Sequence, residues 1–475
     1  MIKKTIVHKF GGTSVGNAER FASVADIVEG YPTRFGGKGF LRSVVVVSAM
    51  SGVTNQLIAG ARAAAEGRET DYDQTIAGLL DRHQAVVEAL LTGTSERPEV
   101  LNFIQDRLVS LKRLYQSIAV LGELTARGQD HVAAFGETLS VHILAAVLRA
   151  RGAQAKAISA TELIVTDDRF GEASPLMDLT CERLQFRLNP MLDREIIPVI
   201  TGFIAATQSG VTTTLGRGGS DYSAAIVGAG LDSDEVCIWS DVDGILTADP
   251  NLVPGARTLR ELSYTEAAEL AYYGANVLHP KTIRPVIEHG ISLRILNSFN
   301  PPDPGTLIIK TPNPTRTRLP SIISTTGLSL IVIGSQDDSW SLNRVARALQ
   351  ALSDARIDVL MFSQSFSEHS LNLIVQAQDQ AQCLKALQTA FDSHIRQRDW
   401  KLETKAEVAT VSVVGTPGWN KVGIVSHAFA ALGALGTRVI AVAQAASENS
   451  VSFCIPEAQV AETVRYLHHE LGLDG

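Results

Sequence analysis

The chain has 475 residues, of which 45% are hydrophobic and 19% charged, the composition of an ordinary globular protein with roughly three domains. Its net charge of -8 argues against nucleic acid or an anionic membrane surface as a partner. The four cysteines have no metal-ligand or disulfide spacing, and neither a leader peptide nor an apolar run near the ~20 residues of a membrane helix is present, so we expect a cytoplasmic protein.

The first expected strand leads into a glycine-rich turn. It covers Thr5 to Phe10, continues as Gly11-Gly12-Thr13-Ser14, and precedes a helix expected from Asn17 to about Tyr31. A turn of this kind before a helix N-terminus suits a phosphate, but the spacing is not Gly-x-x-x-x-Gly-Lys-Ser/Thr, which excludes a P-loop. From these residues alone, Lys9 is either a phosphate-binding cation or a solvated lysine at a strand end.

A second strand and a long helical region follow. Ser43 to Val47 is a β-branched run that delivers small and hydroxyl residues, Ser48 to Asn55, to its carboxyl end. Apolar spacing of three and four predicts mostly helix from Gln56 to about Arg151. His83 lies in the apolar stripe and is expected to be a core or boundary residue and not a ligand, whereas Glu137 is either a helix-surface residue or part of a site.

Further strands are expected at Ala155 to Ser159 and at Ile196 to Thr201, the latter followed by Gly202-Phe203. Strands that alternate with helices, several of them strongly apolar, predict an α/β domain with a mostly parallel sheet covered by helices on both faces.

The segment from residue 212 to 243 carries the densest set of ligand-binding signals. Gly216, Gly218 and Gly219 would let backbone approach a ligand closely, and Arg217 between them suits a carboxylate or phosphate. Ser220 is the expected N-cap of a helix from Asp221 to about Gly228, whose free amides would form an anion site. The strand from Val236 to Trp239 then ends in Ser240-Asp241, at the edge where open α/β sheets bind ligands.

The domain is expected to close with a helix from Tyr264 to Tyr273 and a strand from Ile291 to Leu296, with His279 as a structural turn residue before Pro280. Six prolines between Asn300 and Pro320 mark a boundary. We therefore expect a first domain over residues 1–300 and a proline-rich linker over 301–320.

The remaining chain contains a repeat. Gln364, Glu368 and Ser370 recur as Gln444, Glu448 and Ser450, at an offset of 80 residues. Two copies are too few for a solenoid, so we expect two small α+β modules of the ferredoxin-like βαββαβ type, at residues 321–400 and 401–475. The repeated residues would either face a shared cleft or belong to a simple duplicated packing module.

Five motifs occur in order along the chain. They are Lys9-Phe10-Gly11-Gly12-Thr13-Ser14-Val15, Ser48-Ala49-Met50-Ser51-Gly52-Val53-Thr54-Asn55, Gly136-Glu137, the Thr-Thr-Thr-Leu-Gly-Arg-Gly-Gly-Ser-Asp run ending at Asp221, and Val277-Leu278-His279-Pro280. Together they resemble aspartate kinase (aspartokinase), with the amino acid kinase fold and two regulatory ACT domains. The resemblance covers essentially the whole chain, and it implies ATP-dependent phosphorylation of the β-carboxylate of L-aspartate to 4-phospho-L-aspartate.

The resemblance also implies roles for individual residues. The catalytic residues would be Lys9, Asp221 and Arg217. The aspartate would bind Thr54, Glu137, Phe203, Arg217, Gly218 and Ser220. The nucleotide would bind Lys9, Phe10, Gly11, Gly12, Ser240 and Asp241. Magnesium would be held largely by the phosphates of ATP, so no residue is expected to be a dedicated metal ligand.

In the tail, the resemblance implies feedback inhibition by threonine or lysine and pairing of ACT domains into a homodimer or a dimer of dimers. The effector residues would be Gln364, Ser365, Ser367, Glu368, Gln444, Ser447 and Glu448. The Gln-x-x-Ser-Glu segments look closer to threonine-regulated members, and no fused homoserine dehydrogenase is expected after the second module. Leu246, Asn251 and Asn276 depart from a frequent family pattern and put the details of nucleotide binding in doubt.

Two alternatives stay open at the level of sequence. One is a related kinase that acts on another carboxylate, such as glutamate or acetylglutamate. The other is an amino-acid sensor whose kinase domain no longer turns over.

Overall fold

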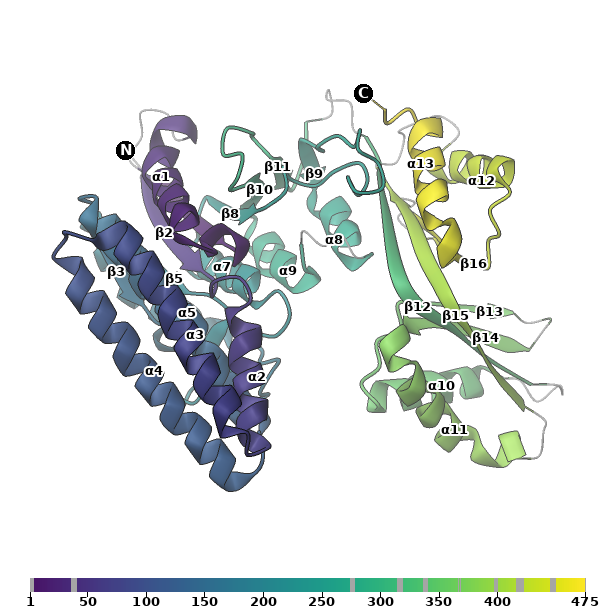
Figure 1. Ribbon diagram of the computed structural model, residues 1–475. Helices are drawn as coiled ribbons and strands as arrows, with labels where there is room; N and C mark the ends of the chain where they lie inside the picture. The colour runs from purple at the N-terminus through teal and green to yellow at the C-terminus, as the bar shows by residue number, and fades with distance from the viewer. Residues whose placement is uncertain are drawn as a thin grey trace. The chain divides into compact units, whose positions relative to one another are not determined.

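The computed structural model describes residues 4–35, 41–273, 278–313, 319–335, 341–365, 367, 369–396, 400–415, 423–444 and 450–474. The chain divides into two compact units (Figure 1). The two are called the kinase unit and the regulatory unit after the family that the sequence resembles, and the kinase unit comprises Met1–Ile245, Arg260–Ala268 and Asn276–Asn313. The regulatory unit comprises Leu246–Leu259, Glu269–Ala275 and Pro314–Gly475.

An eight-stranded sheet forms the centre of the kinase unit, in the order β3-β5-β2-β1-β8-β10-β11-β9. Its strands are β1 (Lys4–Phe10), β2 (Leu41–Val47), β3 (Ala155–Ile158), β5 (Ile197–Thr201), β8 (Glu235–Ser240), β9 (Glu261–Ser263), β10 (Ser292–Asn297) and β11 (Thr306–Ile309). All neighbouring strands are parallel except β10 and β11. In β2, the run from Val44 to Val47 is fully buried, as a β-branched strand covered on both faces should be.

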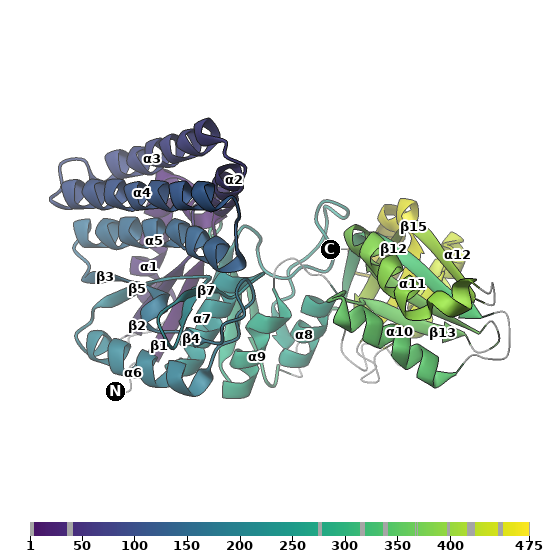
Figure 2. The same cartoon turned by 90° about the horizontal axis from the view of Figure 1, so that it is seen from below.

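Helices cover both faces of this sheet (Figure 2). One face carries α1 (Ala18–Phe35) and α5 (Ala126–Ala150), and α2 (Val53–Ala65), α3 (Glu69–Leu91) and α4 (Glu96–Leu121) pack around α5. The other face carries α6 (Met177–Asp193) and α7 (Gly219–Gly230), with α9 (Pro280–His289) beside α7; α8 is Tyr264–Tyr272. A small sheet of β4 (Val165–Thr166), β6 (Ile204–Thr207) and β7 (Thr212–Thr214) completes the unit.

Among the described residues, α5 is the one helix that is long and apolar enough to cross a membrane by composition. However, 72% of its most apolar window is buried inside the protein. Its composition therefore reflects a core position, and His83, as expected, is also fully buried against this helical layer.

The regulatory unit contains a six-stranded antiparallel sheet in the order β13-β14-β12-β15-β17-β16. Its strands are β12 (Ser321–Ser335), β13 (Met361–Ser365), β14 (Ser370–Gln376), β15 (Trp400–Val414), β16 (Ala441–Gln444) and β17 (Ser450–Pro456). Its helices are α10 (Leu342–Asp354), α11 (Gln380–Arg396), α12 (Ile424–Leu435) and α13 (Val460–Glu470).

The two modules of this unit share their long strands instead of following one another. Ser321 to Thr325 of β12 pair with the end of β15, whereas Leu328 to Ser335 pair with its beginning. A register shift lies between these halves, next to Gly327 (φ 69°) and Glu407 (φ 59°). The expected boundary between residues 400 and 401 therefore differs from the structure, because β12 and β15 each contribute one half to each module.

The boundary after residue 300 also differs from the structure. β11 lies inside the expected linker and pairs with β10 and β9, so the kinase unit continues to Asn313. The prolines that suggested a linker flank this strand without entering it.

The segment Leu246–Leu259 follows the kinase strands in sequence but belongs to the regulatory unit. Ala248 and Val253 are buried in an apolar cluster with β12, α12 and α13. Thr247 makes a buried hydrogen bond of 2.9 Å to His468 Nε2, and its carbonyl accepts from the Ile322 amide at 2.8 Å. No sequence pattern had indicated this excursion.

Candidate active site

Two glycine-rich turns meet at the carboxyl ends of β1 and β2. These strands are parallel neighbours, so their following turns lie side by side. The Ser51 amide donates to the Gly12 carbonyl at 3.1 Å, and a Cβ on Gly12 would lie 3.0 Å from the Ala49 carbonyl oxygen. Glycine at position 12 is therefore required for the close packing of one turn on the other.

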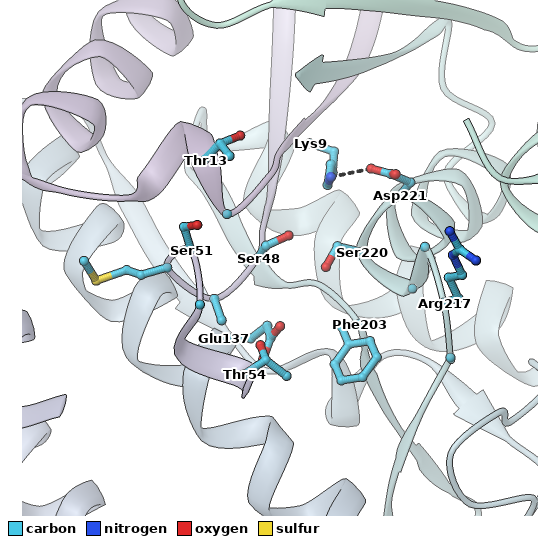
Figure 3. A pocket seen from close by; sticks show the side chains of 17 residues that line it. Lys9, Thr13, Ser48, Ser51, Thr54, Glu137, Phe203, Arg217, Ser220 and Asp221 are labelled. Atoms are coloured by element: carbon cyan, nitrogen blue, oxygen red, sulfur yellow. Dashed lines mark ion pairs between the residues drawn. The ribbon is translucent and has the colours of Figure 1, made fainter. Parts of the chain in front are cut away.

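A cavity of about 500 Å³ opens over these turns. Its lining residues are Lys9, Gly12, Thr13, Ser48, Ala49, Met50, Ser51, Gly52, Thr54, Glu137, Phe203, Gly216, Arg217, Gly218, Gly219, Ser220 and Asp221. The first and the last of them, Lys9 and Asp221, are more than 200 residues apart in the sequence. Figure 3 shows Lys9 beside Asp221 on one side of the cavity, with Glu137, Thr54 and Phe203 on another side.

Lys9 and Asp221 form an ion pair (Figure 3). Their side chains are only 10% and 19% exposed, so water screens the pair weakly. Lys9 is the last but one residue of β1, and a Cβ on Gly11 would approach its Nζ to 3.4 Å. Asp221 thus holds the ammonium group at the mouth of the glycine turn.

The N-terminus of α7 presents the second set of backbone amides. The helix begins at Gly219, with Gly218 as N-cap in a left-handed conformation (φ 69°). The expectation that Ser220 caps the helix was wrong: no side chain caps this end, and Ser220 lies within the first turn. A serine cap would need an extended backbone before the helix, whereas the glycine pair turns the chain two residues earlier.

Glu137 projects from α5 into the opposite side of the cavity. It is 3% exposed, and its Oε2 has no hydrogen-bond partner in the part of the chain that is described. Burial raises the pKa of the Glu137 carboxyl to about 7, against backbone hydrogen bonds at Glu137 and Ala49 that act in the other direction. Gly136 lets α5 pack closely against the turn after β2, since a Cβ on Gly136 would lie 2.6 Å from the Cβ of Ala49. This close packing places the neighbouring Glu137 at the cavity.

Arg217 provides the cation opposite Glu137. It is exposed and makes no ion pair with any described residue. It lies between Gly216 (φ 76°) and Gly218, which turn the chain from β7 towards α7. Phe203, with φ 64°, is fixed by its amide, which donates to Ser223 Oγ at 2.9 Å.

The arrangement therefore brings an ammonium, a guanidinium, a buried carboxyl group and two sets of free amides into one cavity. Such a set of groups suits a site that binds two anionic ligands next to each other, one of which also carries an ammonium group.

A family model for the "Amino acid kinase family" matches residues 4–297. The chain belongs to the amino acid kinase family. A second model, for an ACT domain, matches residues 343–391 and 411–471 of this amino acid kinase. The fold class expected from the sequence and the resemblance on which it was based are thereby confirmed.

Curated relatives of this amino acid kinase are aspartokinases. "Aspartokinase 1, chloroplastic" of Arabidopsis thaliana is 33% identical over 98% of this chain and 79% of its own length. "Bifunctional aspartokinase/homoserine dehydrogenase 2, chloroplastic" of the same plant is 32% identical over 97% of this chain. The chain spans 50% of that bifunctional relative and 56% of the corresponding protein of Haemophilus influenzae.

Solved structures agree over nearly the full length. Escherichia coli aspartokinase III in complex with aspartate and ADP (R-state) has a TM-score of 0.80 and 29% identity, over 99% of this chain and 100% of its own. The same enzyme with lysine and aspartate (T-state) has a TM-score of 0.77 and 29% identity, over 98% and 99% of the two chains.

Most residues expected at the site of this amino acid kinase line the cavity. The nine that do so are Lys9, Gly12, Thr54, Glu137, Phe203, Arg217, Gly218, Ser220 and Asp221. Phe10, Gly11, Ser240 and Asp241 do not line it. The Phe10 ring is fully buried and stacks on Trp239 at 5.8 Å, which leaves only its backbone for a ligand.

Ser240 and Asp241 lie at the end of β8, next to the end of β1 in the sheet. The Ser240 hydroxyl donates to Asp241 Oδ1 at 3.2 Å. Sequence reasoning did not select Thr13, Ser48 and Ser51, which do line the cavity. Their position directly after two buried strands was the available signal.

The three departures from the family pattern have different locations. Leu246 and Asn251 belong to the regulatory unit, where the Leu246 carbonyl accepts from Ser321 Oγ and the Asn251 side chain donates to Asp249. Asn276 lies outside the described residues. His279, expected as a turn residue, accepts from the Lys281 amide and caps α9.

Proposed function

We propose that this chain is an aspartate kinase, which transfers the γ-phosphoryl group of ATP to the β-carboxylate of L-aspartate and forms 4-phospho-L-aspartate. The observation that carries the proposal is the presence of Lys9, Arg217 and Glu137 in one cavity of about 500 Å³. This volume is in the range of sites for small ligands. The identity to aspartokinases over nearly the whole chain supports the same function.

The chemistry of the residues suits this reaction. A β-carboxylate with a pKa near ~3.9 is ionised at neutral pH, so the nucleophile needs no general base. The main task is to bring two anions into line and to stabilise the charge of the moving phosphoryl group. Lys9 and the amides of the two glycine turns would do this, with Asp221 orienting Lys9.

Selection of an amino acid follows from the two opposite charges. Arg217 is matched to the α-carboxylate of aspartate, since a guanidinium can bind a carboxylate through two parallel hydrogen bonds. Glu137 is matched to the α-ammonium, which would become the missing partner of its buried Oε2. Thr54, Phe203, Gly218 and Ser220 would enclose the remainder of the substrate.

ATP would lie over Gly11, Gly12 and Lys9 and extend towards Ser240 and Asp241. Among the described residues, no cluster of three or more His, Cys, Asp or Glu side chains could hold a metal ion. Mg²⁺ would be held mainly by the phosphates, because Mg²⁺ in kinases keeps several waters and takes few protein carboxylates. When bound, the ion would neutralise phosphate charge.

Aspartate-dependent ADP formation by wild type and Lys9→Ala tests the proposal. We expect the variant to be about 10²–10³-fold slower, the usual loss when one charge-stabilising group is removed. A wild type that is as inactive as Lys9→Ala would favour the amino-acid sensor. Faster turnover with glutamate or acetylglutamate than with aspartate would favour the other carboxylate kinases.

We also propose feedback inhibition by threonine or lysine through the paired ACT modules. Gln364 and Gln444 occupy equivalent places in the edge strands β13 and β16, opposite Leu371 and Val451. The Gln364 side-chain nitrogen is buried and has no partner within the described ranges. A buried donor without a partner is costly, so an effector carboxylate or carbonyl there would be stabilising.

The other proposed effector residues lie near Gln364 and Gln444 in sequence. Ser365 Oγ is 3.3 Å from Ser367 Oγ. Glu368, Ser447 and Glu448 lie outside the described residues. The full set of effector contacts therefore stays a prediction.

Activity measured with lysine, threonine and methionine, singly and in pairs, tests this regulation. Gln364→Ala should relieve inhibition, whereas Gln350→Ala, at an exposed glutamine of α10, should not. Full activity of the wild type at millimolar levels of each effector would contradict the proposal. Pairing into a homodimer or a dimer of dimers and a cytoplasmic location remain parts of the same proposal, although several plant relatives are named as chloroplastic.

A further inference from the structure

A second buried carboxylate lies on the same helix as Glu137. Asp130 precedes it by seven residues on α5, two helical turns away, and therefore lies on the same face of the helix. Asp130 is 2% exposed and does not line the cavity. A buried carboxylate away from the substrate needs its own explanation, because burial without partners would be costly.

Asp130 accepts hydrogen bonds from two segments of chain. Its Oδ2 accepts from the Gly171 amide at 2.9 Å and from the Thr214 amide at 3.0 Å. Its Oδ1 accepts from Thr214 Oγ1 at 2.7 Å. Both carboxylate oxygens are thus used, and bonds to a charged acceptor are stronger than neutral ones.

The two segments that Asp130 binds also support each other. The Ala173 amide donates to the Thr214 carbonyl at 2.9 Å. A Cβ on Gly216 would lie 3.2 Å from the Gly171 carbonyl oxygen, so the backbone of one segment packs directly on the other. Thr214 ends β7, and Arg217 follows it by three residues.

Asp130 therefore joins α5 to the base of the turn that carries Arg217. Glu137 on the same helix and Arg217 on this turn are the proposed acceptors of the two charged groups of the amino acid. The separation of these acceptors decides which substrates fit, and a 1 Å error in such a placement can change rates about 10²-fold.

We propose that Asp130 is a positioning residue that sets the spacing between Arg217 and Glu137 and thereby the selection of the amino-acid substrate. This inference rests on the proposed aspartate kinase function. It assigns Asp130 no contact with aspartate or ATP: the residue acts through Thr214 and the turn that follows.

Steady-state kinetics of Asp130→Asn test the inference. An asparagine keeps the shape of the side chain, but its amide nitrogen cannot accept the bonds that the second carboxylate oxygen accepts. We expect the KM for aspartate to rise about ten- to a hundredfold, while the KM for ATP changes less than twofold. Discrimination of aspartate against glutamate should fall as well, because the spacing of the two acceptors is no longer fixed.

Substitutions at Thr214 give an independent test if Asp130→Asn does not fold. Thr214→Val removes only the hydroxyl donor and should raise the KM for aspartate by a smaller factor. Thr214→Ser keeps the hydroxyl and should restore the wild-type KM. A merely structural role would not predict this rescue confined to one substrate.

A control variant separates positioning from general stability. Tyr264→Phe removes a buried hydrogen bond of 2.6 Å to the Ile291 carbonyl, which directly precedes β10. This bond lies at the amino ends of the parallel strands, whereas the cavity lies at the carboxyl ends of β1 and β2. It should lower the denaturation midpoint without changing either KM. Equal changes of both KM values in Asp130→Asn, or a KM for aspartate that is unchanged in both Asp130→Asn and Thr214→Val, would overturn the inference.

The failure of the inference can be distinguished from failure of the proposed function. A wild type that forms ADP with aspartate, together with Asp130 and Thr214 variants that match it, overturns the inference alone. A wild type without aspartate-dependent ADP formation overturns both.

Discussion

The protonation state of Glu137 makes aspartate binding depend on pH. Burial raises the pKa of this carboxyl to about 7 in the ligand-free protein. An ammonium group beside Oε2 favours the ionised form, so aspartate should bind the deprotonated carboxylate. With a pKa of about 7, roughly nine in ten Glu137 side chains are protonated at pH 6 and one in ten at pH 8. The Kd for aspartate should therefore be about tenfold larger at pH 6 than at pH 8, which means weaker binding at the lower pH.

Calorimetric titration with aspartate, without nucleotide, in two buffers of different ionisation enthalpy checks this prediction. Binding should release about 0.9 proton at pH 6 and about 0.1 proton at pH 8. Glu137→Gln should bind aspartate more weakly and without proton release, whereas Glu123→Gln, at an exposed position after α4, should behave as wild type. Equal Kd values at pH 6 and pH 8 in the wild type, or a pH dependence retained in Glu137→Gln, would refute the reasoning.

Three further predictions concern packing and burial. Gly136→Ala should lower the free energy of unfolding by ~1–3 kcal/mol and raise the KM for aspartate, because its Cβ would lie 2.6 Å from a neighbouring side chain; Gly78→Ala, with no atom within 4 Å, should be neutral or stabilising. Burial lowers the pKa of His83 from its ordinary 6.5 to about 4. The stability that the neutral His83 preserves above pH 6.5 is therefore lost as the pH falls from 6.5 through about 4, because the unfolded chain takes up the proton first. His83→Leu should remove up to ~3 kcal/mol of this acid-dependent loss, measured by urea denaturation at pH 7 and pH 4. Thr247→Val should lower the urea midpoint by the equivalent of ~1–3 kcal/mol, because His468 Nε2 would lose its buried partner; an unchanged midpoint would contradict this.

The strands and the turns of the kinase unit were predictable because their signals are local. A β-branched run such as Val44–Val47 has no stable alternative to a buried strand, and glycines directly after it permit the close packing of turns. Strand order then brings the two glycine turns together without further information. Glu137 was ambiguous from spacing alone, since a helix-surface glutamate has the same local sequence. Only the resemblance indicated a site residue, and the structure shows Glu137 lining the cavity.

The remaining features depend on contacts between distant residues. The role of Asp130 requires Gly171 and Thr214 to be adjacent to α5, which no spacing encodes. The sharing of β12 and β15 between modules reflects strand pairing across about 80 residues, and an internal repeat suggests two consecutive modules instead. The cap of α7 was misassigned because serine and glycine both suit this position, and only the backbone conformation decides between them.

Because Leu246–Leu259 belongs to the regulatory unit, the chain cannot be divided into its two units at one position in the sequence. A fragment that stops near the end of β11 would retain Ala248 and Val253 but lose the α12 and α13 surfaces that bury them. Likewise, a fragment that starts at β12 would leave His468 without Thr247. Neither unit can be exchanged between relatives at a single junction. Recombination should be tolerated only where Leu246–Leu259 and the chain from β12 onwards are exchanged together.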